Sequence, residues 1–213
     1  MKRVTVGYIY GSEKLGNEDK TFIKLSKKKN VNLILFNVDK EISEEEIKEK
    51  AKQCDIIFNN AAGYLALELV KTFEELGKKV IDKSKSYYYT EDKWLFYLKC
   101  REHNIPTPET ILLPQNLHGI RKELIDFNNW PIVLKRVSGE QGDYVQKADN
   151  INDAIKIVRK FWGEQDEREP IIAQEFIKSD AYRVTVIGNK ITQTALKKAS
   201  GWKATAVYAE KSH

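Results

Sequence analysis

The first eighty residues alternate short apolar runs with longer segments in which apolar residues recur every three to four positions. The runs are rich in β-branched and aromatic residues, as in buried strands, and the segments between them have the spacing of amphipathic helices. Because strands joined through helices of this length form right-handed crossovers, we predict a parallel sheet. Strands are expected at 4–10, 31–38, 55–60 and 78–82, and helices at 18–30, 43–54 and 64–77.

Two helix ends in this part carry their own signals. Ser43 is expected to cap the helix 43–54, with Glu44 to Glu46 in its first turn. Gly77 is expected to follow the last turn of the helix 64–77. No GxGxxG pattern follows the first strand, so a dinucleotide site is not supported there.

After residue 83 the pattern changes to shorter elements that pair locally. The segment 143–148 is expected to form a hairpin with 131–137, and the tight turn at 188–190 predicts a second hairpin. This part of the chain should therefore be antiparallel. Helices are expected at 90–104 (capped by Thr90), 119–129 and 151–162 (ended by Gly163), and strands at 110–114, 131–137, 143–148, 171–177, 182–188 and 190–199.

The sequence thus predicts an α/β protein with two domains, residues 1–85 with a parallel sheet and residues 86–213 with antiparallel sheets. A chain of 213 residues with 41% hydrophobic residues can bury a real core. No apolar stretch approaches the ~20 residues that span a bilayer, and the start lacks a signal peptide. Cys54 and Cys100 lack metal-site spacing, so we expect reduced, structural thiols in a cytoplasmic protein.

The net charge of +5 is compatible with an anionic ligand but does not specify one. Nucleic-acid binding would rest only on this charge and on aromatic residues such as the tyrosines at 87–89, which we expect to pack at the domain junction. A steep fall of affinity with salt would be needed to support it.

Lys135 stands at the end of the apolar run 131–137, where an ammonium must be paired or reach water. One explanation is an edge lysine whose stem lies along apolar surface. The loop that follows, SGEQGD at 138–143, offers a hydroxyl and two glycines, whose backbone N–H groups can approach a phosphate closely. It is not a P-loop, because GK[ST] is absent and no helix is expected after it, and a plain polar hairpin loop is the alternative.

Two further features point the same way. Lys93 lies in the first turn of its expected helix, where the macrodipole disfavours a cation by ~0.3–1 kcal/mol. In AQEFIKSDAYR (173–183) an apolar strand leaves the core, where a free backbone edge could bind an adenine and the following acid a ribose. Each feature is weak by itself, but their order along the chain is informative.

In this order the segments resemble the ATP-grasp superfamily, in particular the branch with ribosomal-protein glutamate ligase and glutathione synthetase. The resemblance runs from Asp55 to Tyr208, and its first segment, DIIFNN and the helix after it, resembles the end of the family's N-terminal domain. Four later segments each resemble one motif of the family. The family's DK…giPvPkT segment is similar to EDKWLFYLKCREHNIPTPET, and its fPvVvKp segment is similar to WPIVLKRVSGEQGDYV. Its vvQEyI segment is similar to IIAQEFI…YRVTVIGNKI, and its A.kR.a…W.tN segment is similar to ALKKASGWKAT.

The resemblance implies an α+β ATP-grasp domain that binds ATP between two antiparallel halves. It would act as an ATP-dependent carboxylate–amine ligase. The γ-phosphate passes to a substrate carboxylate, and an amine attacks the acyl phosphate to give an amide, ADP and phosphate. Lys93 and Lys135 would contact the phosphates, and the loop that covers them would contain Ser138, Gly139, Gln141 and Gly142. The adenine hinge would consist of Gln174, Glu175, Phe176 and Ile177, and Asp180 would bind the ribose. The transferring phosphate or the acyl substrate would face Arg183, Lys198 and Lys203.

The sequence departs from the family pattern at three positions. The family's acid two residues before the arginine falls on Ala181, so Asp180 stands one place early. The asparagine near W.tN falls on Thr205, or on Ala204 in a shifted register. Lys198 replaces an arginine and loses its bidentate phosphate geometry.

The family's Mg²⁺ ligands, an aspartate and a Glu-x-Asn, come later than the YAEKSH at which this sequence ends. We therefore expect Mg²⁺ ligands beyond residue 213, expect this chain alone to be inactive, and favour a fragment over a natural short form. The alternative function is a non-catalytic ATP-binding or interaction module. The carboxylate and amine substrates, small molecules or peptides, stay open, as does a homo-oligomer.

Overall fold

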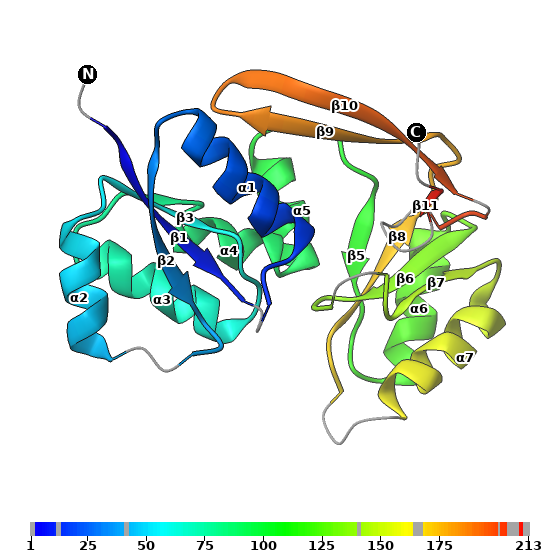
Figure 1. The fold of residues 1–213 in the computed structure, drawn as a ribbon. Coiled ribbons are helices and arrows are strands. Elements are labelled where there is room, and N and C mark those ends of the chain that lie inside the picture. Colours follow the sequence, from blue (N-terminus) through cyan, green and yellow to red (C-terminus); the bar gives the residue numbers. More distant parts are fainter. Residues whose placement is uncertain are drawn as a thin grey trace. The chain divides into compact units, whose positions relative to one another are not determined.

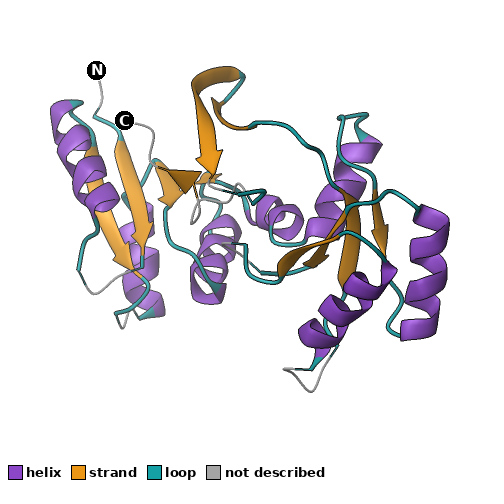
Figure 2. Cartoon of the chain, turned by 90° about the vertical axis from the view of Figure 1, so that its right-hand side faces the viewer, coloured by secondary structure: helices purple, strands orange, loops and turns teal. Residues whose placement is uncertain are grey.

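The computed structural model describes residues 3–11, 14–40, 43–139, 142–163, 168–199, 201–203 and 209–210, the residues 198, 199, 209 and 210 by their backbone only. The chain separates into two compact units, residues 1–88 and 89–213 (Figures 1 and 2). That residues 1–85 and 86–213 are independently folding domains stays a prediction. Within the described residues, no helix has the length and apolar character needed to cross a membrane.

The first unit contains the predicted parallel sheet, with strand order β2-β1-β3-β4. Thr5 pairs with Asn32 and Val6 with Ile56, so β1 lies between β2 and β3. The elements are β1 (Thr5–Tyr10), α1 (Asn17–Lys28), β2 (Asn32–Asn37), α2 (Glu44–Lys52), β3 (Ile56–Asn59), α3 (Tyr64–Glu75), β4 (Val80–Ile81) and α4 (Ser84–Thr90).

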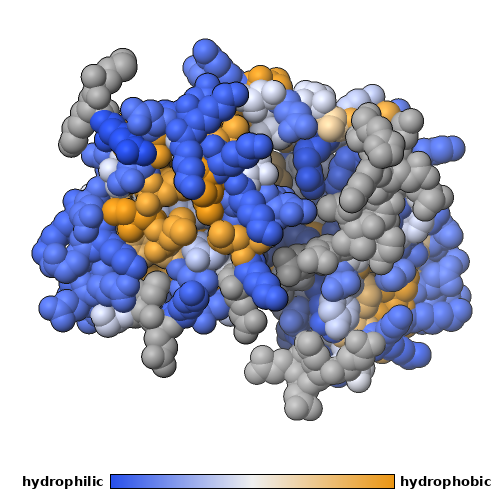
Figure 3. Space-filling view, in the orientation of Figure 1, coloured by the Kyte–Doolittle hydropathy of each residue, from blue (hydrophilic) through white to orange (hydrophobic). Residues whose placement is uncertain are grey.

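The core of this unit lies between the sheet and the helices α2 and α3. Ile9, Phe36 and Ile57 of the sheet are fully buried against residues such as Phe73 of α3. On the other sheet face, the Tyr8 ring stacks on Phe22 of α1, with 4.5 Å between centroids. The Tyr8 hydroxyl donates to Asp19 over 2.6 Å, and burial together with this bond raises the pKa of Tyr8. Hydrophobic residues also gather at the surface over β1 and β2 (Figure 3).

The helix ends agree with the sequence at three of four predicted positions, one of which is Gly163, directly after the helix Ile151–Trp162. The Ser43 hydroxyl accepts a hydrogen bond from the Glu46 amide at the start of α2, and Gly77 follows α3 with a φ of 73°. The prediction of Thr90 as a cap was wrong. Thr90 ends α4, and the Asp92 carboxylate instead accepts from the Leu95 amide over 2.7 Å.

The second unit contains the sheet β5-β8-β6-β7, in which every neighbouring pair is antiparallel, and a separate sheet β11-β10-β9. Both predicted hairpins, β6–β7 and β9–β10, are present. The elements are α5 (Lys93–Glu102), β5 (Thr110–Leu112), α6 (Leu117–Phe127), β6 (Ile132–Arg136), β7 (Val145–Ala148), α7 (Ile151–Trp162), β8 (Ile171–Glu175), β9 (Ala181–Ile187), β10 (Lys190–Ala199) and β11 (Ala209–Glu210).

Helices α6 and α7 cover one face of the sheet β5-β8-β6-β7 (Figure 1). Ile132 and Leu134 of β6 and Ala173 of β8 pack there against residues of both helices, such as Leu124 and Val158. Because successive side chains of a strand point to opposite faces, Val133, Lys135 and Gln174 lie on the other face. We call this the uncovered face, since α6 and α7 do not lie on it.

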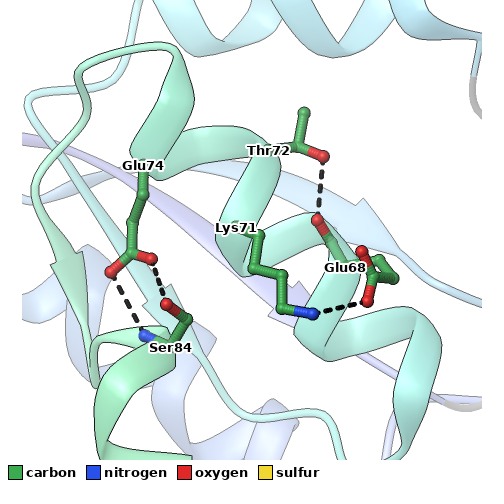
Figure 4. Close-up of polar contacts among 5 residues, drawn as sticks. All are labelled: Glu68, Lys71, Thr72, Glu74 and Ser84. Carbon is green, nitrogen blue, oxygen red and sulfur yellow. Dashed lines mark hydrogen bonds and ion pairs between the residues drawn. The ribbon is translucent and has the colours of Figure 1, made fainter.

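A carboxylate fixes the junction between α3 and α4 (Figure 4). Glu74 of α3 accepts a hydrogen bond from the Ser84 amide over 3.1 Å and from the Ser84 hydroxyl over 2.5 Å. Since α4 has only seven residues, its first turn depends on such a partner for the unbonded amide groups. Nearly two turns earlier on α3, the more exposed Glu68 pairs with Lys71 over 2.7 Å.

We expect Glu74→Ala to lower the free energy of unfolding by about 1–2 kcal/mol, because it removes both hydrogen bonds at the start of α4. Glu68→Ala is the matched control on the same helix and should change stability by at most about 0.5 kcal/mol, since exposed ion pairs contribute little. Urea unfolding of the three proteins measures the difference, and equal effects of the two substitutions would contradict the assignment.

Candidate functional site

Lys135 is the centre of the uncovered face. It lies on β6 opposite Ile172, and its Nζ donates to Gln174 Oε1 over 2.5 Å. The other end of the Gln174 amide donates to the Thr110 hydroxyl over 2.8 Å. Burial, and after it the positive charge of Lys93, lower the pKa of the Lys135 ammonium to about 8.

Lys93 brings a second ammonium close to Lys135. It is the first residue of α5, and its Nζ donates to the carbonyl oxygens of Gly139 (2.7 Å) and Val137 (3.2 Å). Its backbone amide also donates to Val137, so the start of α5 is fixed to the end of β6. Burial lowers the pKa of Lys93, against the effect of three acidic side chains, Glu91, Asp92 and Glu169.

The loop after β6 surrounds these lysines with polar groups. Gly139 and Gly142 have positive φ angles of 111° and 85°, which glycine adopts without strain. The Ser138 hydroxyl donates to Glu169 over 3.0 Å, and the Gly142 carbonyl accepts from Lys203 Nζ over 3.0 Å. Gln141, predicted as part of this loop, lies outside the described residues.

The expected adenine hinge, 174–177, has less free backbone than the sequence suggested. The amides of Glu175 and Phe176 donate to the carbonyls of Glu109 and Pro131, and the Glu175 carboxylate accepts from the Glu109 amide over 3.1 Å. The amide of Ile177 donates to no other described residue. The backbone amide open to a ligand is therefore at Ile177, whose side chain is 51% exposed.

Aromatic and cationic side chains stand next to this hinge. The Phe176 ring meets Trp202 edge to face, with 6.2 Å between centroids, and Lys147 Nζ lies 5.5 Å from its centre. Lys203 Nζ lies 5.7 Å from the Trp202 ring. Trp202 and Lys203 therefore lie near both the hinge and the loop residue Gly142.

Other predicted site residues are not joined to this group by contacts among the described residues. Asp180 is exposed before β9, and Arg183 is exposed on β9, where it pairs with Ala195. Lys198 lies on β10, but its side chain is outside the described residues, as are Ala204 and Thr205. The structure brings the predicted site residues together in two groups. The first group contains Lys93, Lys135, Ser138, Gly139 and Gln174, and the second contains Gly142, Phe176 and Lys203.

The comparison with protein families decides where this chain belongs. The profile of the ATP-grasp domain matches residues 90–200, the part of the chain that carries the site just described. The chain belongs to the ATP-grasp family. The fold class predicted from the sequence, a parallel N-terminal sheet followed by antiparallel ATP-grasp sheets, is confirmed.

Individual relatives agree with the ATP-grasp assignment. A segment of 122 residues is 29% identical to the alpha-aminoadipate–LysW ligase LysX of Saccharolobus solfataricus. The match covers 55% of this chain and 43% of that ligase, so the chain spans less than half of its curated relative's length.

Solved structures share the ATP-grasp fold at low sequence identity. A RimK domain ATP-grasp protein of Sphaerobacter thermophilus has a TM-score of 0.73 at 16% identity, over 92% of this chain and 74% of that one. A D-alanine–D-alanine ligase of Bacillus anthracis has a TM-score of 0.63 at 17% identity, over 95% and 68%.

The candidate site contains two residues that the sequence did not single out. Thr110 lies in the segment that resembles giPvPkT, where only its strand position was predicted. Glu169 ends a charged connection, yet it accepts a hydrogen bond from Ser138 and opposes the lowering of the Lys93 pKa by burial. Neither role has a local signal, because the partners lie tens of residues away along the chain.

The described residues fit the phosphates of ATP but not a metal ion. The buried Lys135 has a neutral acceptor and a second cation beside it, so an anion would relieve uncompensated charge. Among the described residues, no group of three or more His, Cys, Asp or Glu side chains could hold a metal ion.

We expect the stability difference between Lys135→Met and wild type to depend on pH. The unfolded chain keeps the lysine proton up to the ordinary pKa of 10.5, but the folded protein releases it near pH 8. Burial of the charge therefore destabilises wild type below pH 8, and this cost disappears as the pH rises toward 10.5. The advantage of the variant should fall by about 2–3 kcal/mol between about pH 7 and pH 10.

Urea unfolding at several pH values measures this difference, with Lys156→Met as the control. Lys156 is exposed on α7, so its substitution should give a difference that does not change with pH. A flat profile for Lys135→Met would show that the ammonium is not buried as described.

Proposed function

We propose that the uncovered face binds ATP and that the chain is the nucleotide-binding part of an ATP-dependent carboxylate–amine ligase. The observation that carries the proposal is the pair of neighbouring ammonium groups, Lys93 and Lys135, at the end of β6 within the ATP-grasp match. A site with excess positive charge and a glycine-containing loop suits the phosphates of a nucleotide.

The two lysines would contact the phosphates from different elements. Lys135 reaches the site from the sheet and Lys93 from the first turn of α5, so together they can hold two positions of a phosphate chain. Ser138, Gly139 and Gly142 belong to the loop that we propose to close over these phosphates, together with Gln141. The phosphates would replace the carbonyl oxygens of Gly139 and Gly142, which now accept hydrogen bonds from Lys93 and Lys203.

The adenine would lie against the hinge. Its ring nitrogens can accept a hydrogen bond from the Ile177 amide, and its π-face can pack near Phe176 and Trp202. Gln174 and Glu175 would support the hinge, since their side chains are bonded to Lys135 and Glu109. We propose Asp180 as the ribose-binding acid because it follows the hinge closely.

The reaction that we propose forms an amide bond. A substrate carboxylate oxygen attacks the γ-phosphorus and ADP leaves, which gives an acyl phosphate. An amine then attacks the acyl carbon, loses a proton, and releases inorganic phosphate. This chemistry requires positioning and charge neutralisation rather than a protein nucleophile. Arg183, Lys198 and Lys203 would stabilise the transferring phosphate or the acyl substrate.

The relatives suggest the substrate class within the RimK and LysX branch. The name of the LysX relative gives alpha-aminoadipate and the protein LysW as the partners that it joins. By analogy we propose that an amino-acid amine and a carboxylate on a small molecule or peptide are the substrates here. Mg²⁺ ligands beyond residue 213 and inactivity of this chain alone stay predictions.

Lys135→Ala should weaken ATP binding by roughly 10- to 100-fold, because it removes a charge-assisted contact with a phosphate. Lys156→Ala is the matched control, since Lys156 is a lysine on α7, which packs against the opposite face of the same sheet. Isothermal titration with ATP at pH 7 measures both affinities. Unchanged affinity of Lys135→Ala would remove Lys135 from the site.

The alternative, a module that binds ATP without chemistry, predicts a different result from an activity test. We expect ADP formation when ATP, Mg²⁺ and a mixture of amino acids are added to the full-length gene product, and expect Lys135→Ala to abolish it. ATP binding without any ADP formation by the full-length product would favour the non-catalytic module.

A further inference from the structure

A chain of three hydrogen bonds runs from the segment before β5 to the Lys135 ammonium. The Thr110 hydroxyl donates to the Pro108 carbonyl over 2.9 Å. Gln174 Nε2 donates to the Thr110 hydroxyl oxygen over 2.8 Å, and Gln174 Oε1 accepts from Lys135 Nζ over 2.5 Å. Thr110 is only 4% exposed, so its hydroxyl has little access to water.

The chemistry of these groups fixes the direction of every bond. A hydroxyl has one proton, and a carbonyl oxygen can only accept, so the proton of Thr110 must point to Pro108. The hydroxyl oxygen is then left as an acceptor, and the Gln174 amide must turn its NH₂ group toward it. This leaves the Gln174 carbonyl oxygen facing Lys135, the only orientation in which the amide attracts the ammonium.

A reversed Gln174 amide would place donor hydrogens against a positive charge. Two donors facing each other in a mostly buried site would both lose their hydrogen bonds. The charge of Lys93 already disfavours the ammonium of Lys135, so the loss of its fixed acceptor would leave that group without a defined position. The orientation of one buried hydroxyl thus controls a lysine 25 positions further along the chain.

We propose that Thr110 is a positioning residue for Lys135, and that it acts by fixing the orientation of the Gln174 amide. The consequence for ATP affinity rests on the proposed function, but the effect on the ammonium itself does not. Gln174 is neutral, so this arrangement holds the lysine while its full positive charge stays available to an anion.

The test compares Thr110→Val with Thr110→Ser. Valine keeps the shape of threonine but removes the hydroxyl, whereas serine keeps it. The first readout is the exchange of the Lys135 ammonium hydrogens with water, followed by ¹H–¹⁵N NMR near pH 6 and assigned with Lys135→Arg. Thr110→Val should accelerate this exchange and shift the Gln174 side-chain amide signals, and Thr110→Ser should restore both.

A second readout is the affinity for ATP, which should weaken about three- to tenfold in Thr110→Val and stay near wild type in Thr110→Ser. Thr72→Val is the control, since it removes a hydroxyl that donates to the Glu68 carbonyl on α3, and it should leave Lys135 unchanged. Circular dichroism checks that every variant is folded.

Two results would overturn the positioning role: unchanged Lys135 and Gln174 signals in Thr110→Val, or a Thr110→Ser variant that behaves like Thr110→Val. If wild type fails to bind ATP while the NMR signals respond as expected, the positioning role stands and the proposed function fails. The two claims are therefore separable.

Discussion

The alternation of side chains along β6 ties the hydrophobic core to the ATP-grasp site. Ile132 and Leu134 must lie under α6 and α7, and Lys135 consequently lies on the uncovered face. A shift of the strand by one residue would place the ammonium in the core and Leu134 on the other face, so the packing energy of the core also sets the position of the lysine. The next residue, Arg136, returns to the core side.

Arg136 shows how the same strand accommodates a second cation on its other face. Its side chain is 3% exposed, and its guanidinium lies 3.4 Å from the centre of the Tyr144 ring and donates to the Phe161 carbonyl. A planar, weakly hydrated guanidinium suits such a place, whereas a compact ammonium loses more hydration on burial. The strand therefore carries arginine on the face where aromatic packing holds it and lysine on the face where we propose that the ligand binds.

Much of the ATP-grasp fold could be predicted from the sequence, because β1 to β3 and α7 have strong hydrophobic periodicity. Helix α4 was missed, since SKSYYYT lacks that periodicity and its start is held by Glu74 from another helix. The occupied amides of the hinge were also missed, because the sequence does not reveal which strands flank β8. Thr110 meets Gln174 only after β5 and β8 have paired.

Charge alone cannot make this site selective for a nucleotide. Lys93 and Lys135 would attract any phosphate or carboxylate, and attraction between charges depends little on the shape of the anion. In the proposed site, selectivity would therefore come from groups with a defined direction, which are those of the hinge. The Glu175 carboxylate accepts a hydrogen bond from the Glu109 amide, so in the proposed site the Ile177 amide and the Phe176–Trp202 pair would distinguish a purine base. In the proposed nucleotide site, affinity would come from the two lysines and recognition of the base from the end of β8.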